Sequence, residues 1–221
     1  MPSVVVFDVN ETLSDMAPMA DRFNQVGAPS LLAKVWFAAL LRDGFALTAA
    51  GAQERFAVLA AGQLRTVLAG VELDRPVDTA VAHILDGFTH LPVHPDVPDG
   101  VRALRATGRR LVTLTNGAAD IAEQLLTRAG VRAEFEHLLS VEQAPAWKPA
   151  RAAYEYAATA CGTRPADLLL VAVHPWDIDG AARAGLHTAW LNRTHARYPD
   201  YFTPPEHTVA TVGELADRLA G

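Results

Sequence analysis

The sequence has only one cysteine among its 221 residues, Cys161. A single cysteine cannot form an intrachain disulfide, so a hydrophobic core has to stabilise the fold, and a chain of this length can bury one. The sequence also lacks any run of about 18 consecutive apolar residues, so it predicts no membrane span. Its first residues show neither the basic segment nor the cleavage site of a secretory signal, and we therefore expect a cytoplasmic protein.

Positive charge is scarce as well. The 19 lysines and arginines are outnumbered by 25 acidic residues, which gives a formal net charge of −6. No basic run is present that could follow a phosphate backbone, so the composition argues against a nucleic-acid-binding protein. A local basic pocket for a small anion is compatible with these numbers.

The sequence does contain an alternation of short apolar runs and helical stretches. The apolar runs are typical of strands buried on both faces, and they are Val4 to Phe7, Arg110 to Leu114, Leu168 to Val173 and His187 to Leu191. Helical patterns follow them at Ala118 to Ala129, Ala150 to Ala160, Asp179 to Ala184 and Glu214 to Leu219. This alternation predicts an α/β fold built on a Rossmann-like, mainly parallel sheet.

One long segment interrupts the alternation. From Met16 to Leu91 the sequence is rich in Ala and Leu, with apolar residues at helical spacing. Breaks divide it into about four helices, near Gly27, Gly44, Gly51 and Gly70. We therefore predict an α/β core domain of residues 1–15 and 92–221, with a helical cap subdomain of residues 16–91 inserted after the first strand.

Polar motifs follow the predicted strands, at the edge of the sheet where ligands bind in open α/β folds. The segment Asp8–Leu13 follows the first strand, Thr115–Gly117 the second and Trp176–Asp177 the third. A fourth motif, Lys148–Pro149, lies in a loop before a helix.

These four motifs, in this order, resemble those of the haloacid dehalogenase superfamily, and the helical insertion after the first motif resembles its cap. The resemblance covers essentially the whole chain and points to the type II (S)-2-haloacid dehalogenases. One motif alone would be weak evidence because short strings recur by chance, but four in order are specific. The resemblance implies a haloacid dehalogenase-like core with a cap, and a hydrolase without a cofactor.

Three charged residues carry the chemistry that the resemblance implies. Asp8 is the covalent nucleophile, a role that a carboxylate can fill when neighbouring cations keep it ionised. Lys148 is the cation beside it, and Asp177 orients and activates the water that hydrolyses the ester. Simpler explanations exist for the residues taken singly, since Asp8 could cap the following turn and Lys148 could be a solvated lysine at a helix start.

Asn10 and Val173 separate this chain from the superfamily's phosphatases, which carry acids at both positions. Mg²⁺ prefers several hard oxygen ligands. Asp8 and Asp177 alone would make a poor site, although Asp179 could add a carboxylate. We therefore predict no metal and assign Asn10 to substrate binding.

Hydroxyl and amide groups complete the predicted site. Thr12 is assigned to the catalytic residues, whereas Thr115 and Asn116 are suited to binding a substrate carboxylate. A turn-forming Asn-Gly pair would also explain Asn116, and the two roles are compatible. Tyr154 lies six residues after Lys148, where the dehalogenase pattern has a tyrosine that supports the site by hydrogen bonding. Ordinary helix packing would explain Tyr154 almost as well.

His174 departs from the family pattern. The dehalogenases have Ser and Asn where this chain has Ala172 and His174. Histidine titrates near neutral pH, and three roles are open: a general base that assists Asp177, a donor to the leaving halide, or a structural residue. Its position in a motif at a strand end favours the first two.

The cap departs from the pattern too. Dehalogenases of this type hold the substrate or halide with an arginine directly after a tryptophan, but here Phe37 follows Trp36. Arg42 is the nearest cation and is assigned to substrate binding, with a solvated surface arginine as the simpler explanation. Trp36 and Phe37 would form an apolar lid that excludes water.

The resemblance thus implies hydrolysis of a small 2-halo carboxylic acid, from the (S)-2-haloacid to the (R)-2-hydroxyacid, through an ester on Asp8. It also implies a homodimer. The alternatives are a superfamily phosphatase with a degenerate Mg²⁺ site and a non-catalytic protein that binds small acids on the same scaffold. The preferred halogen and chain length stay open, because a fold does not settle the substrate.

Overall fold

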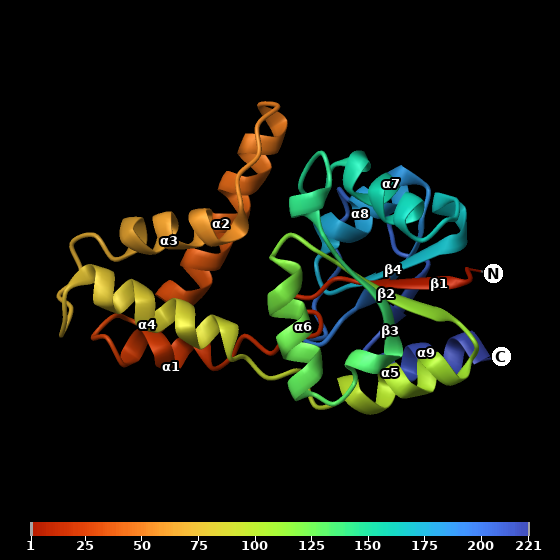
Figure 1. Cartoon of the computed structure of the whole chain (residues 1–221), viewed down its shortest axis with the longest axis horizontal. Helices are drawn as coiled ribbons and strands as arrows, with labels where there is room; N and C mark the ends of the chain where they lie inside the picture. The colour runs from red at the N-terminus through yellow and green to blue at the C-terminus, as the bar shows by residue number, and fades with distance from the viewer. Residues whose placement is uncertain (1, 221) are drawn as a thin grey trace. The chain divides into compact units, whose positions relative to one another are not determined.

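The computed structural model describes residues 2–220, and Figure 1 shows its helices and strands. The chain divides into two compact units, of which one comprises the described residues up to Ser14 and from Pro92 onward, and the other is Asp15–Leu91. Within the described residues, no helix is both long and apolar enough to cross a membrane.

The first unit is built on one sheet of strands β1 (Val4–Phe7), β2 (Arg110–Thr115), β3 (Phe135–Ser140), β4 (Leu168–Ala172), β5 (His187–Leu191) and β6 (His207–Val209). Their order across the sheet is β3-β2-β1-β4-β5-β6, and every neighbouring pair is parallel. The predicted α/β fold with a mainly parallel, Rossmann-like sheet is therefore confirmed.

Helices cover both faces of this sheet. Figure 1 shows α7 (Arg151–Ala160) and α8 (Pro175–Ala184) on one side, and α5 (Val97–Ala106), α6 (Ala119–Arg128) and α9 (Val212–Ala220) on the other. The two central strands, β1 and β4, are apolar throughout because helices cover both of their faces. All four residues of β1 are fully buried. Short 3₁₀ turns, η1 (Arg132–Glu134), η2 (Val141–Gln143) and η3 (Pro165–Asp167), complete the unit.

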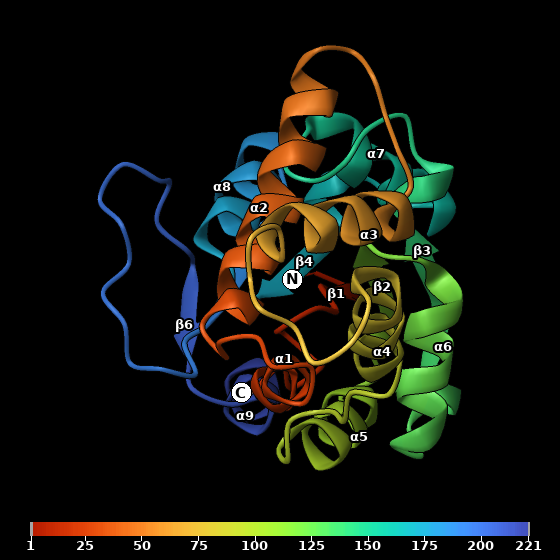
Figure 2. The ribbon, with the colours of Figure 1, turned by 90° about the vertical axis from the view of Figure 1, so that its left-hand side faces the viewer.

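The second unit consists of α1 (Met19–Asn24), α2 (Leu32–Ala49), α3 (Phe56–Val67) and α4 (Val77–Thr89), which can be followed in Figure 2. Its core is aromatic. The ring of Trp36 lies 6.1 Å from that of Phe23 and 5.8 Å from that of Phe88, and its indole N–H donates to the carbonyl of Ala60 at 3.0 Å. Trp36 thus ties α1, α3 and α4 to α2.

Two boundary predictions are wrong. We predicted a break at Gly44, but α2 runs through it, and Gly44 is buried inside the helix. A helical glycine costs only about 1 kcal/mol relative to alanine, which the packing of an 18-residue helix readily outweighs. We also began the helix near the last motif at Asp179, whereas α8 begins at Pro175, a residue well suited to a first helical turn. Asp177 therefore lies in the first turn of α8.

Candidate active site

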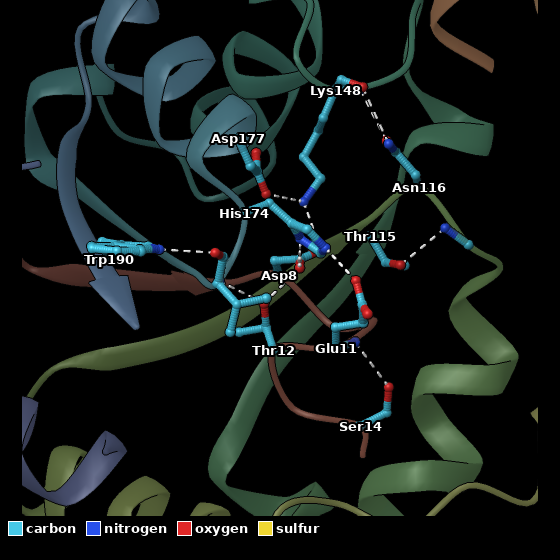
Figure 3. Close-up of polar contacts among 12 residues, drawn as sticks. Asp8, Glu11, Thr12, Ser14, Thr115, Asn116, Lys148, His174, Asp177 and Trp190 are labelled. Carbon is cyan, nitrogen blue, oxygen red and sulfur yellow. Dashed lines mark hydrogen bonds and ion pairs between the residues drawn. The ribbon is translucent and has the colours of Figure 1, made fainter. Parts of the chain in front are cut away.

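Four segments of the first unit meet where β1, β2 and β4 end, as Figure 3 shows. Asp8 directly follows β1, and His174 lies just beyond the end of β4. These strands are parallel neighbours, with Phe7 opposite Val171, so their ends bring Asp8 and His174 together. Lys148 enters from the loop before α7, and Asn116 follows β2.

Lys148 is fully buried and lies between two carboxylates. Its Nζ is 2.9 Å from Asp8 Oδ1 and 2.6 Å from Asp177 Oδ2. Burial by itself would lower the pKa of Lys148, but the negative charges of Asp177 and Asp8 outweigh this and raise it. The side chain is therefore an ammonium ion at neutral pH.

Asn116 fixes the backbone of Lys148. Its amide nitrogen donates to the carbonyl of Lys148 at 3.1 Å, and its amide oxygen accepts from the Lys148 N–H at 2.9 Å. Both ends of the Asn116 side chain are thus engaged, although no second hydrogen bond from its amide nitrogen is found within the described residues. The prediction that Asn116 contacts a substrate carboxylate stays a prediction.

Asp8 is surrounded by donors. Besides Lys148, Thr12 Oγ1 donates to Asp8 Oδ2 at 2.6 Å, and His174 Nδ1 lies 3.2 Å from the same oxygen. Burial would raise the pKa of Asp8, but the charge of Lys148 and the hydrogen bonds of His174 and Thr12 outweigh it and hold the pKa well below its usual value. Thr12 is itself oriented, because its Oγ1 accepts from the Val173 N–H at 3.1 Å. Asp8 is therefore ionised and held in one orientation.

Asp177 is fully buried, and both of its carboxylate oxygens are engaged. Oδ2 accepts from Lys148, while the Tyr154 hydroxyl donates to Oδ1 at 2.6 Å. Burial, helped by the neighbouring charge of Asp8, raises the pKa of Asp177 despite the opposing charge of Lys148. The small size of Gly180 permits this arrangement, since a Cβ there would lie 2.7 Å from the Tyr154 hydroxyl.

His174 lies between Asp8 and Glu11. Its Nε2 is 2.8 Å from Glu11 Oε2, and its ring stacks on Trp176 with the ring centroids 4.9 Å apart. Burial would lower the pKa of His174, but the hydrogen bonds to Asp8 and Glu11 outweigh it and raise the pKa to about 9. At neutral pH the ring is an imidazolium that donates on both sides.

Glu11 was not among the site residues predicted from the sequence. Its backbone is left-handed, with φ of 63°, and both of its backbone polar groups are tied down. The N–H donates to Ser14 Oγ at 3.2 Å, and the carbonyl lies 3.0 Å from His94 Nε2. Such a conformation costs roughly 1–2 kcal/mol for a residue with a side chain and is common at functional sites. Its position inside the first motif was the only signal in the sequence.

Thr115 and Asn10 lie at the same end of the sheet. Thr115 Oγ1 accepts from the Gly117 N–H at 2.9 Å, which leaves the hydroxyl proton free to donate. Asn10 is buried beside this turn, since a Cβ on Gly117 would lie 3.5 Å from the Asn10 amide nitrogen. Neutral donors are therefore close to the Asp8 cluster, as a binding site for a small anion requires.

The three residues predicted in the cap belong to the helical unit. Trp36 and Phe37 are buried with their rings 6.3 Å apart, and packing within that unit accounts for Trp36. The side chain of Arg42 is 68% exposed and pairs with its neighbour Asp43 at 2.8 Å. Their predicted contacts with substrate stay predictions.

Comparisons with known proteins agree on one family. The family model described as haloacid dehalogenase-like hydrolase matches residues 2–185. A haloacetate dehalogenase of Moraxella sp. (strain B) is 28% identical over 218 residues, covering 98% of this chain and 97% of its own. An (S)-2-haloacid dehalogenase of Pseudomonas putida is 26% identical over 219 residues, covering 97% of this chain and 95% of its own. The crystal structure of an L-2-haloacid dehalogenase superposes with a TM-score of 0.93 at 27% identity, covering 100% of this chain and 99% of that one.

Proposed function

Because the chain belongs to the haloacid dehalogenase-like hydrolases, we propose that it is a metal-independent dehalogenase of small 2-haloacids that works through an ester on Asp8. The names of the relatives, a haloacetate dehalogenase and an (S)-2-haloacid dehalogenase, support the substrate class. One observation carries the proposal: an ionised, oriented Asp8 is held by the buried ammonium of Lys148 at 2.9 Å.

In the first half of the reaction, a carboxylate oxygen of Asp8 attacks the carbon that bears the halogen. The carbon–halogen bond breaks as the carbon–oxygen bond forms, and halide leaves. Attack from the side opposite the halogen inverts the carbon, so an (S)-2-haloacid gives an ester of the (R)-hydroxyacid. Lys148 and Thr12 fix the direction of the carboxylate, which supplies part of the catalytic effect by orientation.

In the second half, water attacks the carboxyl carbon of Asp8. The bond between that carbon and the alkyl oxygen breaks, which releases the hydroxyacid and restores the carboxylate. The positive charge of Lys148 stabilises the oxyanion that forms on the way, since Nζ already lies within hydrogen-bond distance of Oδ1. Asp177 and His174 are the two candidates to activate the water.

A substrate carboxylate needs donors near Asp8. We assign this task to the Thr115 hydroxyl and the Asn10 amide. The hydroxyl of Thr115 has its proton free, and within the described residues the Asn10 amide forms no hydrogen bond. The second N–H of the Asn116 amide is a third donor at the same strand end.

The residues fit a metal ion poorly, which weighs against the phosphatase alternative. Lys148 Nζ occupies the space between the two carboxylates that an Mg²⁺ ion would share. The neighbouring imidazolium of His174 adds a second positive charge. No group of three His, Cys, Asp or Glu side chains in the described part of the chain could hold an ion.

Halide release in the presence of EDTA tests the proposal. We expect the protein to release chloride from (S)-2-chloropropionate at the same rate with and without EDTA, because no step uses a metal. Fluoroacetate and (R)-2-chloropropionate would show the preferred acid. Hydrolysis of p-nitrophenyl phosphate that appears only after Mg²⁺ is added, with no halide released from any acid, would instead make the protein a phosphatase.

A further inference from the structure

We propose that Glu11 and His174 form the general base of ester hydrolysis, with His174 Nδ1 taking the proton of the attacking water and Glu11 holding the ring through Nε2. The inference rests on the proposed function and identifies the residues that activate water in the second half of that reaction. It makes His174 a catalytic residue and Glu11 a positioning residue.

The geometry is that of a base and the acid that orients it. Glu11 Oε2 lies 2.8 Å from Nε2, so an Nε2 proton is shared with Glu11 and the acid–base atom is Nδ1. Nδ1 lies 3.2 Å from Asp8 Oδ2, which places the Asp8 carboxyl carbon within reach of a water that donates to Nδ1. The stacked ring of Trp176 keeps the imidazole in this orientation.

Asp177 is less suited to this task. Its side chain is fully buried, and its two oxygens already accept from Lys148 and Tyr154 at 2.6 Å each. A proton taken by Asp177 would weaken its pairing with Lys148, which also holds Asp8. Asp177 therefore positions Lys148, and the proton of the water goes elsewhere.

Esterification itself prepares His174 for its role. In the resting site His174 faces two carboxylates, Asp8 and Glu11, and stays protonated. The ester of Asp8 is neutral, so one of the two negative charges that retain the Nδ1 proton disappears. Burial then favours the neutral ring, with its remaining proton on Nε2 towards Glu11.

The protons balance over one cycle. After halide leaves, the Nδ1 proton passes to solvent, which is the one proton that the net reaction releases. Water then gives a proton to Nδ1 as its oxygen bonds to the Asp8 carboxyl carbon. When the carbon–oxygen bond to the hydroxyacid breaks, that proton passes to the leaving oxygen. The new Asp8 carboxylic acid gives its own proton to Nδ1, which restores the resting pair of ions.

Other charged groups around the ring do not change during this cycle. Lys148 stays paired with Asp177, and its Nζ lies 6.0 Å from the Trp176 ring that stacks on His174. His94 Nε2 lies 3.0 Å from the backbone carbonyl of Glu11. Asp8 is therefore the group whose charge changes beside His174.

Glu11→Gln in single turnovers with (S)-2-chloropropionate tests the inference. We expect one equivalent of chloride per enzyme to be released at a rate close to that of the wild type, while hydroxyacid formation slows at least about tenfold. The alkyl ester should then accumulate on Asp8 as a mass increase of the intact protein. Glu206→Gln is the matched control, because Glu206 pairs in the same way with His187 at 2.7 Å, away from the site, and it should behave as the wild type.

The outcomes separate the inference from the proposed function. Two outcomes would overturn the inference that Glu11 and His174 form the base. One is that Glu11→Gln forms hydroxyacid as fast as the wild type, and the other is that its reaction is slower but no ester accumulates on Asp8. Either would leave the dehalogenase itself intact. No chloride from the wild type would instead overturn the proposed function.

A second measurement needs no turnover. Asp8→Asn imitates the neutral ester, so the pKa of His174, followed by NMR, should fall from its resting value of about 9. An unchanged pKa would contradict the inference that neutralising Asp8 makes His174 lose its Nδ1 proton. The NMR spectrum of the variant should also place the remaining proton on Nε2.

Discussion

Asp8→Asn is expected to lower halide release by at least about 10⁴-fold, because a neutral amide cannot displace halide from carbon. The side chain keeps its shape, and the folded state should persist. Halide release is measured with (S)-2-chloropropionate, and thermal unfolding reports on the fold. Asp200→Asn, at an exposed carboxylate that pairs with Arg197, is the control and should keep full activity.

This prediction also distinguishes an enzyme from a binding protein on the same scaffold. A binding protein would release no halide before or after the substitution. Measurable release by the wild type that survives in Asp8→Asn would show that another group attacks the substrate, and Asp8 would lose its role.

Lys148→Met is expected to destabilise the protein by about 3–5 kcal/mol, because it leaves the buried carboxylate of Asp177 without a counter-ion and Asp8 with only the imidazolium of His174. Activity should fall as well, since Asp8 loses the charge that lowers its pKa. In this variant the unfolding free energy should rise as the pH falls from neutral, because the folded state now binds protons more tightly than the unfolded chain does. Urea unfolding at several pH values measures this.

The double variant Lys148→Met/Asp177→Asn separates stability from activity. It removes the unpaired charge of Asp177, so it should recover part of the lost stability and none of the activity. A Lys148→Met protein as stable as the wild type would contradict the assignment of Lys148 as a buried ion that holds both carboxylates.

The sequence predicted the parts of the site that depend on sheet topology. Asp8 and His174 each follow a buried apolar strand, and parallel strands of one sheet end at the same edge. The strand pattern therefore places both residues at this edge, whereas their direct contact depends on β1 and β4 being neighbours in the sheet. The identification of Lys148 depended on the order of the motifs, because a lysine before a helix is unremarkable by itself.

The role of Glu11 could not be predicted in the same way. Its contact with His174 depends on a left-handed backbone at Glu11, a conformation that glutamate rarely adopts. Hydrogen bonds with Ser14 and His94 hold that turn, and His94 is distant in the sequence. A local pattern carries no information about such a partner.

Outer strands were missed for a related reason. β3 has the exposed Glu136 and the half-exposed His137 in its middle, and β6 has only three residues. Continuous apolar runs identify central strands that are buried on both faces, and they fail for strands nearer the edge of a sheet. The helix α5 was not predicted either. Its Pro98 lies in the first helical turn, where proline is well tolerated, so a proline at this place does not exclude a helix.

The central claim is that Asp8 attacks the substrate and is then hydrolysed. It is tested most directly by a single turnover in H₂¹⁸O, with enzyme in excess over (S)-2-chloropropionate, followed by mass analysis of the Asp8 peptide and of the product. The account predicts ¹⁸O in the Asp8 carboxylate and none in the lactate, whose new oxygen comes from Asp8. Labelled lactate with an unlabelled Asp8 would show that water attacks the substrate directly and would contradict the ester mechanism.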